Sequence, residues 1–252
     1  MKKLLVSWLL SVVVVGVSCA QTVGDLSDLN YWGVGPNRAG IVIDWNDGKG
    51  DETLAWGFQW SGSLALIDAL DFLAAADPLL FFRIDSASSL GAAIFGVGYQ
   101  VGISPFGVSG ALDEFGNPVT PTFLAGVSDM NNNPTSIQAP QSSVSAVPVN
   151  PVDHYKEGWN DNGFWSLYFQ GSDNYTPTPG SAYPTTWTDS YLGVSGTPLI
   201  NDGWYALSIT EPDFTPNLPG AAVAAVPEPS ALVLVLLASC GLIHAKKRLH
   251  VG

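Results

Sequence analysis

Alternation of hydrophobic and polar residues predicts most of the secondary structure of this chain. Residues 39–45 are rich in β-branched side chains and run into Asn46-Asp47-Gly48, which is typical of a strand followed by a turn. Residues 53–60 alternate, so that three large aromatic side chains would share one face of a second strand. The two segments together predict a pair of neighbouring strands joined by an acidic turn.

One segment has helical periodicity instead. Its apolar residues predict a helix from about 64 to 76, with Ser63 as candidate N-cap and Asp77-Pro78 as its end. Further strands are expected at residues 79–84, 90–101, 164–170, 185–193 and 204–210. The pattern therefore predicts an α+β fold, mainly β-strands with one clear helix, and the alternative is an all-β sandwich.

Composition divides the 252 residues into four parts. An exported body is expected at 21–211, with a flexible insert at about 131–152 where Asn, Pro, Ser and Gln dominate. Residues 212–226, rich in Pro and Ala, are interpreted as a spacer. Residues 1–20 and 227–252 have the composition of targeting segments.

The N-terminal segment has the three regions of a secretory signal peptide. Lys2 and Lys3 precede an apolar run, which ends at the small residues Ser18-Cys19-Ala20. We expect a signal helix that is cleaved after Ala20. A retained membrane anchor and a lipoprotein modified at Cys19 are the alternatives.

The C-terminal segment combines a Pro-Glu-Pro motif, a short apolar run and a basic cluster. The motif is Pro227, Glu228 and Pro229, and the apolar run covers residues 231–245. As a helix the run would span roughly 22 Å, which is shorter than a ~30 Å hydrocarbon core. It predicts a short transmembrane helix. The basic cluster consists of Lys246, Lys247 and Arg248.

These three features, in this order, resemble a PEP-CTERM sorting signal over residues 226–248. The resemblance implies recognition of Pro227, Glu228 and Pro229 by an exosortase in Gram-negative bacteria that make exopolysaccharide. The secretion machinery and the exosortase would then be partners, and the inner membrane would hold the tail transiently. The protein would end at the cell surface or in the extracellular matrix.

The body is similar to β-grasp-like exported domains, of which the transcobalamin-like C-terminal domain is one family. The likeness rests on the helix around residues 68–70, on Trp165-Ser166-Leu167-Tyr168, and on Gly193-Val194-Ser195 followed by Asp202-Gly203. It bears on fold class alone, and it implies no ligand-binding residues.

Charge and cysteine content exclude several classes of protein. The formal net charge is −13, and a body this acidic repels phosphate backbones, which excludes nucleic-acid binding. The two cysteines, Cys19 and Cys240, lie in the terminal segments. The body therefore has no disulfide framework and no thiolate metal site.

The body lacks the usual catalytic motifs, which argues against an enzyme. His154 is its only histidine and lies in a Pro-rich segment, so we interpret it as a solvated loop residue. There is no Gly-x-Ser-x-Gly motif, no dinucleotide fingerprint and no P-loop. A non-enzymatic protein without a cofactor is predicted, and a secreted hydrolase acting on polysaccharide is the alternative.

The acidic turn is a candidate calcium site of low specificity. Asp44, Asn46, Asp47 and Asp51 concentrate oxygen ligands, but glycine falls at the fifth position of the loop rather than the sixth. The turn therefore does not match an EF-hand, and an acidic hairpin turn is the simpler interpretation.

Aromatic residues are the remaining candidate for a function. Sugars stack their C–H faces on exposed aromatic rings, although aromatic residues on strands more often belong to the core. The candidate ligand platform consists of Trp56, Trp60, Trp159, Trp165 and Trp187. An exported protein with glycan or small-ligand binding is predicted, with a purely structural matrix component as the alternative.

Overall fold

The structure is a computed structural model, and it describes residues 21–85, 92–110, 146–158, 163–210 and 215–226. Across these residues the fold is mainly β-sheet with one α-helix, which confirms the predicted α+β class. The helix is α1 (Leu66–Ala76), and a short 3-10 helix, η1 (Leu26–Asp28), lies near the start of the described chain.

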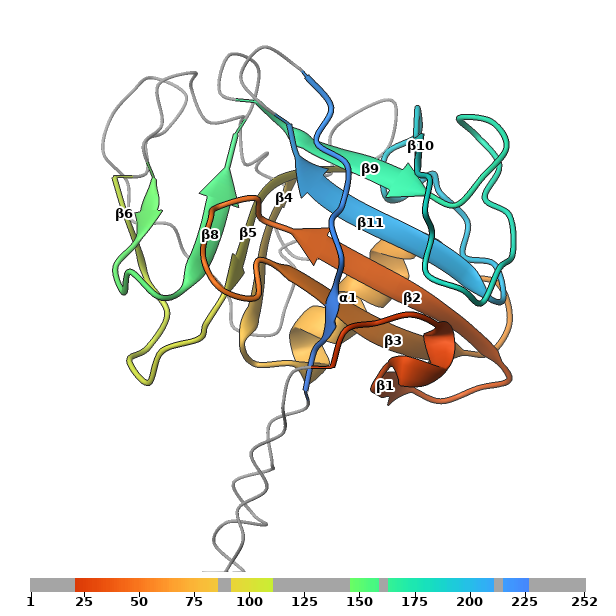
Figure 1. The fold of residues 1–252 in the computed structure, drawn as a ribbon, viewed down its shortest axis with the longest axis horizontal. Helices are drawn as coiled ribbons and strands as arrows, with labels where there is room; N and C mark the ends of the chain where they lie inside the picture. The colour runs from red at the N-terminus through yellow and green to blue at the C-terminus, as the bar shows by residue number, and fades with distance from the viewer. Residues whose placement is uncertain (1–20, 86–91, 111–145, 159–162, 211–214, 227–252) are drawn as a thin grey trace, which may run out of the picture.

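A mixed sheet of seven strands forms the larger layer (Figure 1). Its strands are β1 (Tyr31–Gly33), β2 (Asn37–Asp44), β3 (Thr53–Trp60), β9 (Trp165–Phe169), β10 (Thr188–Asp189), β11 (Gly203–Ile209) and β12 (Val223–Ala224). Their order is β1-β3-β2-β11-β9-β10, and β12 also pairs with β3. β2 and β3 form the antiparallel hairpin that alternation predicts, whereas β2 and β11 run parallel.

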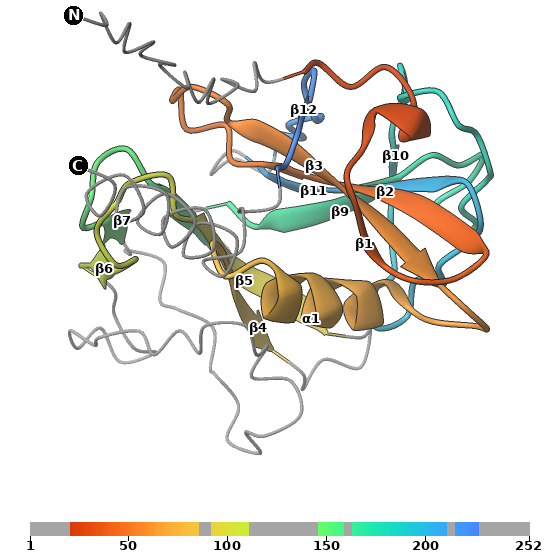
Figure 2. The same ribbon diagram turned by 90° about the horizontal axis from the view of Figure 1, so that it is seen from below.

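A smaller antiparallel sheet packs against the larger one together with α1, as Figure 2 shows. It consists of β4 (Leu80–Asp85), β5 (Ala93–Tyr99) and β8 (His154–Glu157), in the order β4-β5-β8. A two-strand ribbon, β6 (Val108–Ser109) with β7 (Val147–Pro148), lies beside it. The strand expected at 185–193 is reduced to β10, because the rest of that segment turns away to bridge the two sheets.

The helix begins at Leu66, two residues later than predicted, and Ala65 rather than Ser63 is its N-cap. Asp68 Oδ2 accepts a hydrogen bond from the Ala65 N–H at 2.8 Å. Its negative charge in the first turn also suits the positive end of the helix dipole. Leu66, Leu70 and Leu73 are buried under the larger sheet, as the helical spacing of apolar residues predicts.

The main core lies between the larger sheet and the second layer. Trp56, Phe58 and Trp60 point into it from β3, so the predicted shared face is confirmed. The indole N–H groups that become buried there keep hydrogen-bond partners, as burial of a polar group requires. Trp56 Nε1 donates to Asp77 Oδ2 at 2.9 Å, and Trp45 Nε1 donates to the Val97 carbonyl at 2.9 Å.

The opposite face of the larger sheet is covered as well. Val42, Ala55 and Trp204 lie on this face under the segments that carry Leu26 and Ala222. The Trp204 ring lies directly over Gly40, where a Cβ atom would come within 2.2 Å of the indole. Glycine at this position therefore gives the indole its place against the sheet.

The first and last described segments pair with each other, which contradicts the predicted spacer over residues 222–225, while residues 212–214 lie outside the described structure. The Val23 N–H donates to the Ala222 carbonyl at 2.9 Å, and the Ala224 N–H donates to the Gln21 carbonyl at 3.1 Å. The Ala225 N–H donates to the Ala55 carbonyl on β3 at 2.8 Å. Small side chains let this backbone lie close against the sheet, so a composition typical of a spacer supplies an edge strand instead.

The predicted insert at 131–152 is also wrong in its last part. Residues 146–152 include β7 and the turn into β8, with the Val149 N–H donating to the Gly107 carbonyl at 2.8 Å. Residues 131–145 lie outside the described structure. Among the described residues no helix is long and apolar enough to cross a membrane. The predicted signal helix at 1–20 and the apolar run at 231–245 lie outside them.

We predict that Gly40→Ala destabilises the body, because the new methyl group must displace the Trp204 indole. Overpacking of this kind costs about 1–3 kcal/mol, which chemical denaturation would measure. Gly50→Ala is the matched control, since no described atom lies within 4 Å of a Cβ atom placed there. Equal stability of the two variants would contradict the predicted role of Gly40.

Candidate functional site

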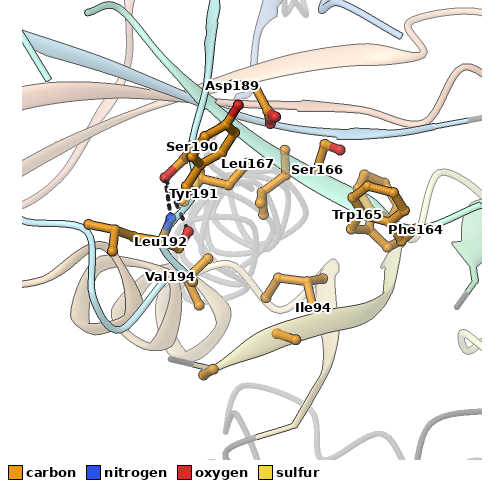
Figure 3. Close-up of a pocket in the computed structure, with 14 residues that line it drawn as sticks. Ile94, Phe164, Trp165, Ser166, Leu167, Asp189, Ser190, Tyr191, Leu192 and Val194 are labelled. Atoms are coloured by element: carbon orange, nitrogen blue, oxygen red, sulfur yellow. Dashed lines mark hydrogen bonds between the residues drawn. The ribbon is translucent and has the colours of Figure 1, made fainter. Parts of the chain in front are cut away.

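A pocket of about 240 Å³ opens where the two sheets approach each other. The start of β5 forms one wall, the start of β9 forms another, and the loop at 189–194 closes the third (Figure 3). This volume is somewhat below the range of about 300–1,000 Å³ that is usual for drug-sized ligands. The pocket therefore suits a single small unit, such as one ring of a larger ligand.

Apolar side chains form the inner part of the pocket. Ile94, Leu167 and Val194 converge on its middle in Figure 3, and Trp165 lies at one end. Trp165 is 6% exposed, and its Nε1 donates to the Lys156 carbonyl at 3.2 Å. The hydrogen bond fixes the indole, so that the wall it forms is rigid before any ligand arrives.

Polar side chains of the lining residues stand across β9 from these apolar groups. In Figure 3 the oxygen atoms of Ser166, Asp189 and Tyr191 lie on the same side, above the apolar side chains. Partial burial raises the pKa of Asp189, and the structure gives its carboxylate no cationic partner among the described residues. Asp189 pairs with Tyr168 on β9, so its carboxylate stands on the Tyr168 side of the sheet, where it can accept hydrogen bonds from a ligand that reaches this edge.

The loop that closes the pocket is attached to both sheets. The Ser190 N–H donates to the Leu167 carbonyl on β9 at 2.8 Å, and the Val194 N–H donates to the Ala92 carbonyl at 3.1 Å. Between these points the Ser190 hydroxyl contacts the backbone of Leu192, accepting from its N–H at 3.2 Å. The pocket wall is thus built from backbone hydrogen bonds.

The same chain segment caps the helix. The Leu66 and Ile67 N–H groups at the start of α1 donate to the carbonyls of Thr197 and Val194, at 2.8 and 3.1 Å. First-turn N–H groups have no acceptor inside their own helix, and here the carbonyls of the loop serve as acceptors. The pocket wall and the helix start are therefore positioned by one segment, residues 190–199.

The structure separates the residues of the predicted aromatic platform. Trp56 and Trp60 are 0% and 3% exposed in the core, so the prediction that they face a ligand is wrong. They are buried because β3 presents one whole face to the second layer. Trp165 is also a core residue, but it contacts the pocket. Trp159 lies outside the described residues.

Trp187 is half-buried on the other face of the larger sheet. Its ring packs edge-on against Tyr183, with the ring centroids 5.8 Å apart, and Tyr183 in turn packs against Trp204. Burial is the main cause that raises the pKa of Tyr183. These rings cover the sheet face that carries Trp204, and they do not join Trp165 in one surface.

The acidic turn does not gather its carboxylates around one point. Asp44 Oδ1 and Oδ2 accept hydrogen bonds from the N–H groups of Asn46 and Gly220, at 2.9 and 3.0 Å. Asp47 instead faces Lys49 and His154. Among the described residues no group of three or more His, Cys, Asp or Glu side chains is arranged to hold a metal ion. Asp44, Asn46, Asp47 and Asp51 lie at the end of β2 and in the turn that leads to β3.

His154 is fully buried in β8, so its interpretation as a solvated loop residue is wrong. Its ring stacks on Trp45 with the ring centroids 5.0 Å apart, and Nδ1 lies 3.1 Å from Asp47 Oδ2. Nε2 has no hydrogen-bond partner among the described residues. The pair fastens the β2–β3 turn to the second sheet, and His154 is not among the residues that line the pocket.

A charge of the opposite sign stabilises Asp47. Burial acts to raise the pKa of Asp47, but the hydrogen bond and charge of His154, with Lys49 nearby, outweigh it and hold the pKa below its ordinary value. Asp47 therefore contributes stability above the ordinary pKa of an aspartate, and this contribution is lost as the pH falls through its lowered pKa.

Sequence reasoning missed most of the pocket. The sequence predicts Trp165 as a ligand residue, but it places Asp189, Tyr191 and Leu192 in a strand at 185–193 rather than in a site. Serine often accepts a hydrogen bond from the backbone two residues later, as Ser190 does, and this favours a loop. The sequence does not indicate which sheets that loop joins. The predicted sorting residues Pro227, Glu228 and Pro229 and the basic cluster Lys246, Lys247 and Arg248 lie outside the described residues.

Comparison with family models, with curated proteins and with solved structures gave no match for this chain.

We predict that Asp47→Asn destabilises the body at pH values above the ordinary pKa of an aspartate. Removing a buried carboxylate that contacts His154 and Lys49 costs about 1–3 kcal/mol, and the difference from the original protein shrinks as the pH falls below ~4, where an ordinary aspartate becomes neutral. Denaturation curves at a series of pH values measure this.

The matched control is Asp51→Asn in the same turn, an exposed aspartate for which the described residues give no ion pair. It removes the same charge and should leave stability nearly unchanged at every pH. A difference between Asp47→Asn and the original protein that stays constant from pH 3 to 7 would contradict the ion-pair argument.

Proposed function

We propose that this chain is an exported, non-enzymatic protein of the cell surface or extracellular matrix whose body binds one unit of a neutral glycan. The observation that carries the binding role is the pocket between the two sheets, which is lined mainly by apolar side chains and has Asp189 and Tyr191 at its edge. A pyranose ring has the same division, with C–H groups on its faces and hydroxyl groups around its edge.

The charge of the lining selects against acidic ligands. Asp189 is the only charged residue among the described residues that line the pocket, and a carboxylate can accept hydrogen bonds from hydroxyl donors without a countercharge. An anionic ligand would meet both this carboxylate and the net charge of −13 of the chain. A neutral sugar avoids this repulsion and keeps both the stacking and the hydrogen bonds.

The proposal that the protein is not an enzyme rests on the composition of the lining. The described residues around the pocket include one carboxylate and no histidine, so they supply neither a nucleophile with its base nor a pair of carboxylates. A secreted hydrolase would need one of these arrangements. A purely structural role is the other candidate, because Trp56 and Trp60 are spent on the core.

The proposal for export rests on the two targeting patterns and on where the body ends. Gln21 follows the expected cleavage site, and Val226 precedes Pro227. Between them, the backbone of Gln21 to Val23 is hydrogen-bonded to that of Ala222 and Ala224. This edge of the sheet is thus made without either targeting segment, which fits a body that loses one segment to a signal peptidase and the other to an exosortase.

The binding role is tested by titrating the full-length protein with neutral oligosaccharides while following its tryptophan fluorescence. We expect saturable binding that is abolished by Leu192→Trp, which fills the pocket, and weakened about tenfold by Asp189→Ala, which removes an acceptor at the pocket edge. Asp51→Asn controls for loss of charge. Binding of amines or acidic sugars in preference to neutral sugars would overturn the proposal, and silence across the panel would favour a structural role.

The sorting role is tested by replacing Pro227, Glu228 and Pro229 with alanine in a host that makes an exosortase. We expect the variant to keep its tail, gain mass by that amount and stay in the inner-membrane fraction. Pro216→Ala, an exposed proline shortly before the motif, is the matched control and should be processed normally. Normal size and location of the triple variant would contradict the proposal.

A further inference from the structure

Two exposed tyrosines continue the pocket outward. Tyr191 lines the pocket, and Tyr175 lies edge-on to it with the ring centroids 5.7 Å apart. Their exposed fractions are 58% for Tyr175 and 57% for Tyr191, in contrast to the tryptophans of the core. The aromatic surface therefore extends beyond the volume of the pocket itself.

Hydrogen bonds fix the backbone on both sides of this pair. The Tyr191 N–H donates to the Asn174 carbonyl at 3.0 Å, and Asn174 Nδ2 donates to the Asp189 carbonyl at 2.7 Å. Asp173 Oδ1 accepts from the N–H groups of Tyr175 and Thr176, at 2.9 and 2.8 Å. The loop of Tyr175 is thus tied directly to the strand and loop that form the pocket.

Rings that are exposed and held in place lose little entropy when a ligand covers them. Tyrosine has few rotatable bonds for its contact area, which is why it is common in binding loops. Neither ring contributes to the hydrophobic clusters of the two sheet faces. These two rings therefore contribute little to the core, and their position beside the pocket makes them available to a ligand.

Charge around the pair continues the pattern of the pocket. Asp173 accepts from the Tyr175 N–H, and Asp189, which lines the pocket, accepts from the Asn174 side chain through its carbonyl. Three of the cations of the body, Arg38, Lys49 and Arg83, are held in ion pairs with Asp202, Asp47 and Glu157. The extended surface accepts hydrogen bonds and repels anions, as the pocket does.

We propose that Tyr175 and Tyr191 form a second subsite, continuous with the pocket, so that the ligand is a neutral polysaccharide chain held at two or more successive rings. This inference rests on the proposed glycan binding at the pocket. One ring occupies the pocket against Trp165, and the next stacks on the exposed tyrosines. Affinity then depends on chain length, which a pocket that holds a single ring would not produce.

The test measures affinity against chain length, with the full-length protein in a detergent that has no sugar headgroup. The probes are the monosaccharide, disaccharide and tetrasaccharide of whichever neutral sugar the pocket binds. We expect the tetrasaccharide to bind at least about tenfold more tightly than the monosaccharide, a gain of one ordinary stacking contact or more.

The variants separate the two subsites. Tyr175→Ala should remove the gain with chain length and leave the affinity for the monosaccharide unchanged, while Tyr175→Phe should retain the gain. Phe72→Ala, which removes another exposed aromatic ring, should change neither affinity. Leu192→Trp should abolish binding of every probe.

The outcomes distinguish this inference from the function on which it rests. Equal affinity for all chain lengths, or a length dependence that Tyr175→Ala does not alter, overturns the second subsite and leaves glycan binding at the pocket intact. Absence of binding to every probe overturns the proposed function and the inference together.

Discussion

The arrangement of the two layers depends on backbone hydrogen bonds made by one irregular segment, residues 190–199. Ser190 ties it to β9 of the larger sheet, Val194 ties it to the start of β5 in the smaller sheet, and Thr197 caps α1. Backbone groups withdrawn from water need partners, so this segment can leave regular structure only by meeting both sheets and the helix. The pocket follows from the same requirement, because its third wall is the loop that makes these bonds.

The larger sheet is covered on both faces, which explains the unusual composition of the body. A sheet with one solvated face needs polar residues at every second position, whereas β11 is buried along its whole length. Close packing on the second face then requires small residues below large ones, as Gly40 lies below Trp204. Few charged residues are needed on such strands, and the acids collect in the turns.

The periodicity of the sequence predicted the position of strands and of the helix, which depend on local pattern. It did not predict burial or pairing that depends on residues far away in the sequence. The strands at 39–45 and 53–60 and the helix at 64–76 are found within two residues of their expected ends. His154 was misjudged because its burial depends on Trp45 and Asp47, which lie far away in the sequence. The strand β12 was read as a spacer because alanine and valine pack only when an open sheet edge is present. The candidate site could not be predicted for the same reason, since the loop of Asp189 and Tyr191 becomes a pocket wall only through its contacts with both sheets.

The pairing of Gln21 to Val23 with Ala222 and Ala224 makes the body almost a closed ring. A unit whose entry and exit lie side by side can be inserted into a surface loop of another protein without stretching the host. It can also be closed by a short linker, which would reduce the entropy of the unfolded chain while straining the folded one little. Several copies joined in tandem would each remain an independent domain, because the two ends of each copy pair with each other at its own sheet edge.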